Sequence, residues 1–313
     1  MEDKLLKNVK VIKETDSHFT FEKVTKKTAL LCTNGFQNAD LHDATPMREY
    51  FKDSFSDEFH GCEVVPVQLF HPAVPSTHHH KMFEKILEKT ILEYTAKGYD
   101  IILLGYSFSA SLCCKMQAKY PHSIKKLILV APVYDTILNG MIPGYLNYAF
   151  KFAKLSKKYG PKIAKAMGRT TTKGMVSLLI SILMSLLTCR SYVKKVTCNT
   201  LIFWGMEDEL CTAHSLKKVT SKLNVPNIVY KYPGMTHAIL KSVKQNGIVY
   251  EDILHYAFGT PFIIEKKTES VLKNNEKKIK LDEDGEPIPS FQDIFSEIDP
   301  ELEQETLEDN KVL

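Results

Sequence analysis

The chain has 313 residues, of which 44% are hydrophobic and 25% are charged, and its net charge at pH 7 is +4. A chain of this length and composition can bury a large core. α/β enzymes of this size often form one domain with insertions. No apolar stretch follows the charged residues 1–4 and the closest long apolar run, residues 174–188, is short and contains three serines, so we expect neither a secretory signal nor a membrane-spanning helix.

Short apolar runs alternate with helical patterns, which is typical of βαβ units and a mostly parallel sheet. Strands are predicted at residues 9–13, 19–24, 28–33, 62–70, 100–104, 126–131, 200–204 and 227–232. Several of them are continuous runs of Ile, Leu and Val, as expected for strands that helices cover on both faces. Helices are predicted at residues 45–51, 81–96 and 109–120, and Gly98 is expected to end the second of them.

The alternation stops at residue 136 and resumes with the strand at residue 200. Residues 136–196 contain eleven Lys or Arg and no Asp or Glu, in two or three helical stretches. We interpret residues 136–195 as a helical cap inserted into a core formed by residues 1–135 and 196–264. Two interpretations of the cap stay open: an insert with a solvated basic face and an apolar face packed on the core, or an apolar acyl-binding lid that docks on anionic lipid.

Residues 265–313 are polar and charged, which predicts a flexible tail. Within them, residues 281–313 hold twelve acidic residues and one lysine, a net charge of −11, so the rest of the chain carries +15. The tail either stays free and solubilising or folds back over the basic cap.

The strand at residues 100–104 runs into Gly105-Tyr106-Ser107-Phe108-Ser109, and the next helix begins at once. So sharp a turn needs small residues two positions on either side of its apex, and Gly105 and Ser109 supply them. The apex residue then takes a strained conformation with its side chain above the sheet. Ser107 occupies this apex and is the candidate nucleophile.

In these residues the sequence resembles the α/β-hydrolase superfamily. Residues 28–36 look like that family's third strand and oxyanion loop, with Asn34-Gly35 in place of the usual His-Gly pair. The resemblance implies an α/β-hydrolase fold with a mostly parallel sheet, helices on both faces and an inserted cap. It also implies an oxyanion hole formed by the backbone N–H groups of Phe36 and Phe108.

The same resemblance points to the partners of Ser107. The family's Gly-x-x-Asp after a later strand matches residues 205–208, which makes Asp208 the triad acid, although Glu207 and Glu209 are its neighbours. Asp135, also at a strand end, is a distant second candidate. The family's histidine after a Pro-Gly turn matches His237. The order Ser, Asp, His is the order this fold uses.

We therefore expect a serine hydrolase that cleaves an ester or thioester with an apolar acyl group through an acyl-enzyme on Ser107. The alternatives are a thioesterase or acyltransferase acting on a carrier-bound acyl chain, and a hydrolase-like protein that binds without cleaving. No metal or organic cofactor and no nucleic acid is implied.

Two further residue groups bear on chemistry and location. The chain has seven cysteines, and the adjacent Cys113 and Cys114 lack the spacing of a metal or redox pair. We therefore expect reduced thiols in a cytoplasmic protein. Peripheral contact of this protein with anionic membrane is expected only through the basic cap. Three adjacent histidines, residues 78–80, lack the spacing of metal ligands on one face, so we expect a solvated loop there.

Overall fold

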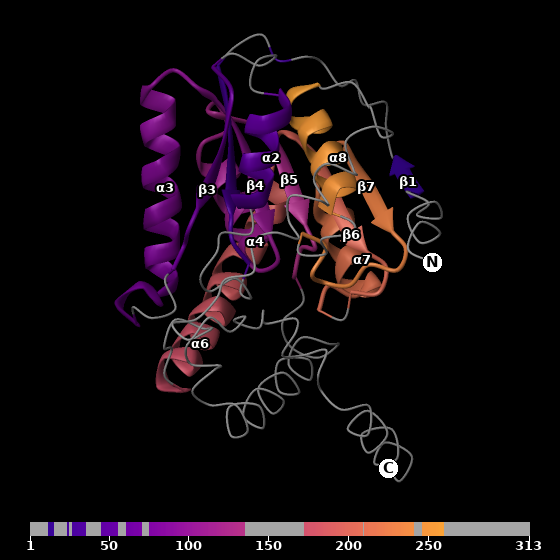
Figure 1. Cartoon of the computed structure of the whole chain (residues 1–313). Helices are drawn as coiled ribbons and strands as arrows, with labels where there is room; N and C mark the ends of the chain where they lie inside the picture. The colour runs from indigo at the N-terminus through magenta and orange to yellow at the C-terminus, as the bar shows by residue number, and fades with distance from the viewer. Residues whose placement is uncertain are drawn as a thin grey trace, which may run out of the picture.

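In the computed structural model, the described residues form one central sheet of seven strands (Figure 1). The structure describes residues 12–15, 24, 27–35, 45–55, 61–70, 75–134, 172–208, 210–240 and 246–259. The strands are β1 (Ile12–Thr15), β2 (Thr28–Thr33), β3 (Glu63–Val67), β4 (Asp100–Tyr106), β5 (Ile124–Val130), β6 (Asn199–Gly205) and β7 (Asn227–Tyr232). Their order across the sheet is β1-β7-β6-β5-β4-β2-β3. β1 is antiparallel to β7 and all other neighbours are parallel, which confirms the predicted mostly parallel α/β sheet.

The inner strands are buried because helices cover the sheet on both sides. Every residue of β2 is buried, and in β4 and β6 only the first residue is not. Parallel strands of this kind need crossover connections, so their carboxyl ends all lie at the same edge of the sheet. That edge is where loops from different strands can bring polar side chains together.

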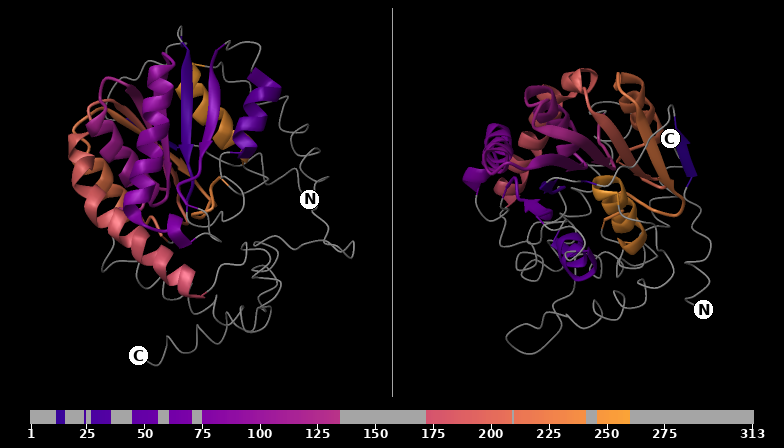
Figure 2. Two further views of the ribbon diagram at one scale, coloured as in Figure 1. Left: turned by 90° about the vertical axis from the view of Figure 1, so that its left-hand side faces the viewer. Right: turned by 90° about the horizontal axis from the view of Figure 1, so that it is seen from above.

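The helices divide between the two faces of the sheet (Figures 1 and 2). They are α2 (Thr45–Phe55), α3 (His80–Ala96), α4 (Ser109–Lys119), α6 (Thr172–Cys189), α7 (Ala213–Lys222) and α8 (Asn246–Phe258), with short 3-10 turns η1 (Pro75–Thr77) and η2 (Arg190–Lys195). Buried residues of α2 and α8 share one apolar core, and those of α3, α4, α6 and α7 share the other. The predicted coverage of both faces is therefore confirmed.

The helix α3 illustrates how the local sequence fixes an element. Phe83, Leu87 and Ile91 recur at helical spacing and are all buried. The N-cap is His79, whose Nδ1 accepts a hydrogen bond from the Lys81 N–H, 3.3 Å away. Just past the helix end, Gly98 takes the left-handed φ of +79°, as predicted for a terminating glycine.

Several element bounds differ from the prediction. β1 spans Ile12–Thr15, and residues 9–11 of the strand predicted at 9–13 lie outside the described residues. Of the predicted strand at 19–24 the structure describes only Val24, which is not in a strand. β3 stops at Val67, well short of residue 70, whereas β4 continues to Tyr106. The helices α7 and α8 were not predicted.

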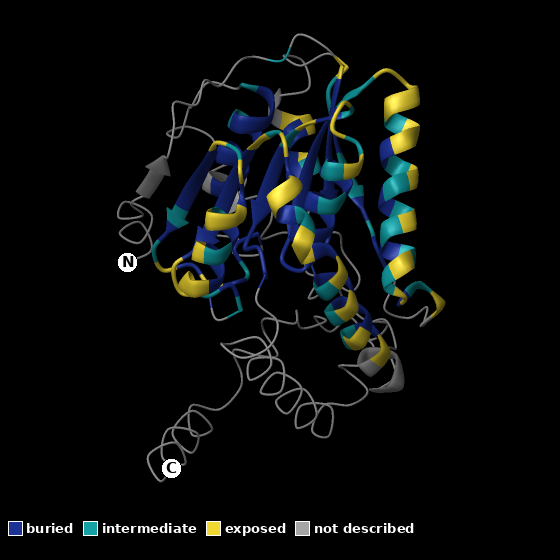
Figure 3. Ribbon diagram, turned by 180° about the vertical axis from the view of Figure 1, so that it is seen from behind, coloured by how far each residue is buried: buried dark blue, intermediate teal, exposed yellow. Residues whose placement is uncertain are grey.

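The predicted cap is described only through α6 and η2. The helix α6 packs against α3 and α4, with Leu178, Ile182 and Leu186 facing inward and almost fully buried. Ser181 and Ser185 lie on this buried face as well, while Ile180 and Met184 are 57% and 40% exposed. Figure 3 shows buried and exposed positions alternating along α6. The basic residues 150–169 and the tail from residue 265 lie outside the described residues.

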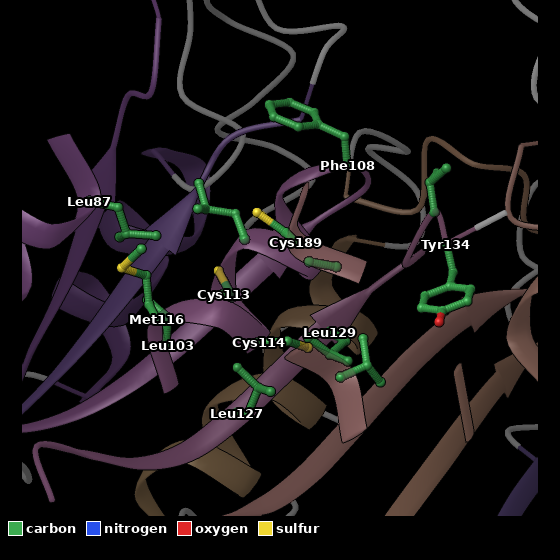
Figure 4. Packing of buried hydrophobic residues seen from close by; sticks show 14 of the residues in the cluster. Leu87, Leu103, Phe108, Cys113, Cys114, Met116, Leu127, Leu129, Tyr134 and Cys189 are labelled. Carbon is green, nitrogen blue, oxygen red and sulfur yellow. The ribbon is translucent and has the colours of Figure 1, made fainter. Parts of the chain in front are cut away.

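A sulfur-rich core lies under this part of the fold. Cys113, Cys114 and Cys189 pack with Leu127 and Leu129 (Figure 4). All seven cysteines are free thiols. Burial raises the pKa of Cys113 to about 12 and that of Cys114 well above the ordinary value, so these thiols stay protonated at neutral pH. Cys113 and Cys114 are therefore residues of the apolar core.

Candidate active site

Ser107 stands at the turn between β4 and α4, in the conformation that the sequence predicts. Its φ is +62°, a left-handed value that costs a non-glycine residue about 1–3 kcal/mol. The Ser107 N–H donates to the Val130 carbonyl at 2.9 Å, which ties the turn to β5. A Cβ on Gly105 would lie 2.6 Å from the Ala110 Cα, so the strand and the helix approach each other too closely for any side chain there.

The other small residue of the turn, Ser109, fixes its shape by hydrogen bonds. The Ser109 hydroxyl donates to the Tyr106 carbonyl at 2.7 Å and accepts from the Tyr106 N–H at 2.9 Å. The Thr33 hydroxyl on β2 lies 2.8 Å from the Ser109 Oγ and donates to the Leu104 carbonyl at 2.9 Å. All these groups are buried, so the strain at Ser107 is held by contacts on both sides of it.

The structure brings Ser107, His237 and Asp208 into one hydrogen-bonded row. His237 Nε2 lies 2.8 Å from Ser107 Oγ, and His237 Nδ1 lies 2.9 Å from each carboxylate oxygen of Asp208. Because an ionised carboxylate can only accept, Nδ1 carries the proton of the neutral imidazole and Nε2 is left to accept from the serine hydroxyl. The three residues are 3–7% exposed.

Asp208 is held by the loop that follows β6. Its Oδ1 accepts hydrogen bonds from the Leu210 N–H at 2.8 Å and the Cys211 N–H at 2.7 Å. Cys211 is anchored in turn, since its thiol donates to the Pro132 carbonyl at 3.0 Å and its own carbonyl accepts from the Trp204 indole at 2.6 Å. Burial and the nearby Asp208 charge raise the pKa of the Cys211 thiol, which therefore remains a donor.

Backbone hydrogen bonds join the loop after β6, which carries Asp208, to the loop after β7, which carries His237. The Met206 N–H donates to the Tyr232 carbonyl and the Glu207 N–H donates to the Met235 carbonyl, both at 3.0 Å. A Cβ on Gly205 would lie 2.3 Å from the Met235 carbonyl oxygen, so only glycine permits this approach. Gly234, with a φ of +74°, makes the turn before His237. These contacts set the separation of Asp208 and His237.

Comparison with solved structures identifies this architecture. An esterase from Exiguobacterium antarcticum is 13% identical, with a TM-score of 0.50 over 80% of this chain and 97% of its own. A metagenome-derived lipolytic enzyme is 10% identical, with a TM-score of 0.53 over 79% and 97%. A thermophilic esterase from Thermogutta terrifontis is 14% identical, with a TM-score of 0.50 over 79% and 93%. The chain has the α/β-hydrolase fold. No family model and no curated protein matches the sequence.

Within the α/β-hydrolase fold, one of the two expected oxyanion donors is described. Phe108 follows Ser107 directly, and its backbone N–H lies at the N-terminus of α4. The Phe108 ring is fully buried and packs with the rings of Phe70 and Phe83, at centroid distances of 6.2 and 5.8 Å. This packing fixes the peptide group that follows Ser107. Phe36 lies outside the described residues.

The departure of this chain from the usual His-Gly pair has a structural role. The Asn34 side chain is buried, its Oδ1 accepts from the Leu69 N–H at 2.8 Å and its amide donates to the Gly35 carbonyl at 3.1 Å. It thus ties the segment leaving β2 to the segment leaving β3. The sequence alone does not reveal this contact, because Leu69 is 35 residues away.

Of the other acidic candidates, Glu207 is exposed, and Glu209 and Asp135 lie outside the described residues. The prediction of a solvated loop at residues 78–80 is wrong for His78, which is 1% exposed and packs edge to face on the Phe70 ring. His79 is exposed and stacks on His80. Burial and the neighbouring His79 lower the pKa of His80. Among the described residues there is no group of three or more potential metal ligands.

Proposed function

We propose that this protein is a serine hydrolase that cleaves a carboxylic ester or thioester with an apolar acyl group. The observation that carries the proposal is the row formed by Ser107, His237 and Asp208, with hydrogen-bond distances of 2.8 and 2.9 Å and the serine at a strained turn. Nucleophile, base and orienting acid in this arrangement constitute the geometry of serine acyl transfer.

In the first half of the reaction His237 Nε2 takes the proton of Ser107 as Oγ attacks the substrate carbonyl carbon. The Asp208 carboxylate stabilises the imidazolium that forms. The negative charge on the carbonyl oxygen is received by the N–H groups of Phe36 and Phe108. Loss of one such donor costs about 3–4 kcal/mol of transition-state stabilisation in comparable sites. The leaving alcohol or thiol then takes the proton from His237, and Ser107 carries the acyl group.

In the second half a water molecule attacks the acyl-enzyme. His237 accepts one proton from this water, the new C–O bond forms, and the bond to Ser107 Oγ breaks. The proton on His237 returns to Ser107, and a carboxylic acid leaves. If another alcohol or thiol replaces water, the same steps transfer the acyl group, which is the acyltransferase alternative.

The apolar character of the acyl group is proposed from the sequence of the cap, residues 136–195, whose helical stretches are rich in apolar residues. Phe108, Phe70 and Phe83 pack together in the core beside the Ser107 turn and support its position. The reaction needs no metal or organic cofactor.

A screen of p-nitrophenyl esters and acyl thioesters of graded chain length tests the proposal. We expect kcat/KM to rise from acetyl to medium or long chains, because each buried methylene contributes about 0.8 kcal/mol. Faster turnover of thioesters than of matched esters would favour the thioesterase alternative. No turnover of any substrate, together with no reaction with a fluorophosphonate, would favour a binding protein instead.

We also propose that the enzyme is cytoplasmic and that it contacts anionic membranes peripherally through α6. Among the described residues, one helical segment, Ser177–Lys195, is long and apolar enough to cross a membrane by length and composition, which core helices also satisfy. Its inner side packs on α4, and its outer side exposes Ile180 and Met184. The same segment ends in η2, where the basic residues Arg190, Lys194 and Lys195 are exposed. Exposed apolar and basic residues on one segment suit the surface of an anionic bilayer.

The membrane proposal predicts that the protein binds phosphatidylglycerol vesicles more tightly than phosphatidylcholine vesicles, and that salt weakens this binding. Replacing Ile180 and Met184 together by glutamine should reduce the affinity, since it removes apolar area that would enter the interface. Vesicle co-sedimentation measures both effects. Leu92→Gln is the matched control, because Leu92 is 48% exposed on α3. Equal binding to both vesicle types would contradict the proposal.

A further inference from the structure

Tyr106 links the strand that carries Ser107 to the loop that carries His237. It is the last residue of β4, directly before Ser107, and its side chain is 1% exposed. Its hydroxyl donates a hydrogen bond to the backbone carbonyl of His237 at 2.9 Å. Its ring stacks beside the imidazole, with centroids 5.8 Å apart and planes 20° apart. One side chain therefore contacts both the backbone and the ring of His237.

We propose that Tyr106 is a positioning residue that holds the His237 imidazole at hydrogen-bond distance from Ser107. This inference rests on the proposed function, because it assigns a task to Tyr106 in that same site. Tyr106 itself does not touch the reacting atoms. It acts through His237, and its own backbone is fixed on both sides by the Ser109 hydroxyl.

The loop that carries His237 is also held by hydrogen bonds at other residues. The Met235 carbonyl accepts from the Glu207 N–H, and the Leu240 carbonyl accepts from the Tyr250 hydroxyl at 3.3 Å. The hydroxyl of Tyr106 meets the loop at His237 itself. Removing this hydroxyl takes a hydrogen bond from a buried carbonyl, which must then shift or bind water. A small displacement there moves the imidazole, and proton transfer is sensitive to such displacements.

The stacked ring adds a second effect on the same base. His237 becomes a cation when it takes the Ser107 proton, and an aromatic face within about 6 Å attracts a cation. The ring and the hydroxyl can be separated by substitution, because phenylalanine keeps the ring and leucine removes both.

The test compares Tyr106→Phe and Tyr106→Leu with the wild type on p-nitrophenyl butyrate, with kcat expressed per site titrated by a fluorophosphonate. Titration removes the contribution of unfolded protein, so a merely structural role would leave kcat per site unchanged. We expect kcat to fall about 10-fold in Tyr106→Phe with KM changed less than about two-fold, and to fall further in Tyr106→Leu.

Tyr50→Phe is the matched control, because Tyr50 is also buried and its hydroxyl hydrogen-bonds to Glu251 on α8 rather than to His237. It should lower thermal stability and leave kcat per site unchanged. Wild-type kcat per site in Tyr106→Phe, or an equal loss in Tyr50→Phe, would overturn the role of Tyr106 while leaving the proposed function intact. If the wild type neither reacts with the fluorophosphonate nor turns over the ester, the proposed function fails first, and the inference fails with it.

Discussion

Replacing Ser107 by alanine is expected to abolish ester turnover and to leave the folded structure unchanged. The substitution removes one oxygen from a 3% exposed position and keeps a Cβ, so the strained turn meets no new clash. Without Oγ no acyl-enzyme forms. By analogy with serine proteases, the loss in kcat should be on the order of 10⁶-fold. Steady-state kinetics and the melting temperature measure the two effects separately.

His237→Ala should cost nearly as much, and the double variant should be no worse than either single one, because nucleophile and base act as a unit. Ser111→Ala is the matched control, since Ser111 is a buried serine on α4 close to the turn. It should retain wild-type kcat. Substantial activity in Ser107→Ala, or additive losses in the double variant, would contradict the assignment.

Asp208→Asn is expected to lower kcat on the order of 10⁴-fold with little effect on folding. The reason follows from the loop geometry, because Oδ1 accepts from the Leu210 and Cys211 N–H groups. The asparagine oxygen must occupy that place, so its NH₂ group takes the Oδ2 position, which also lies 2.9 Å from His237 Nδ1. An NH₂ group there donates to Nδ1 and favours the tautomer with the proton on Nε2, in which His237 cannot take the proton of Ser107. The measurement is kcat as a function of pH.

Glu207→Gln serves as the control for Asp208→Asn, because Glu207 is the adjacent acid and is exposed. It should leave kcat near the wild-type value. Asp135→Asn distinguishes the second candidate acid. A severe loss in Asp135→Asn together with a mild one in Asp208→Asn would mean that the acid is misassigned.

The turn around Ser107 could be predicted because its constraints are local. A buried strand, a small residue on each side and an immediate helix all lie within about twenty residues, and the structure has each of them. The loops of Asp208 and His237 could be located because each follows a recognisable apolar strand. The close fit of these loops, through Gly205 and the Met235 carbonyl, needed the structure.

What could not be predicted depends on contacts between distant residues. Residues 249–254 of α8 are all buried, so this helix lacks the amphipathic pattern that reveals surface helices. His78 is buried because it packs on Phe70, which no local pattern indicates. The hydrogen bond from Tyr106 to His237 spans 131 positions. The sequence places Tyr106 inside the motif, but nothing in the motif assigns a role to that position.

The role of Ser107 is tested most directly by reacting the full-length protein with a fluorophosphonate and locating the adduct by peptide mass spectrometry. We expect one adduct per chain, on Ser107, at a rate that falls strongly in His237→Ala because the serine then has no base. An adduct on another residue, or a labelling rate that is unchanged in His237→Ala, would contradict the claim that Ser107 is a nucleophile activated by His237.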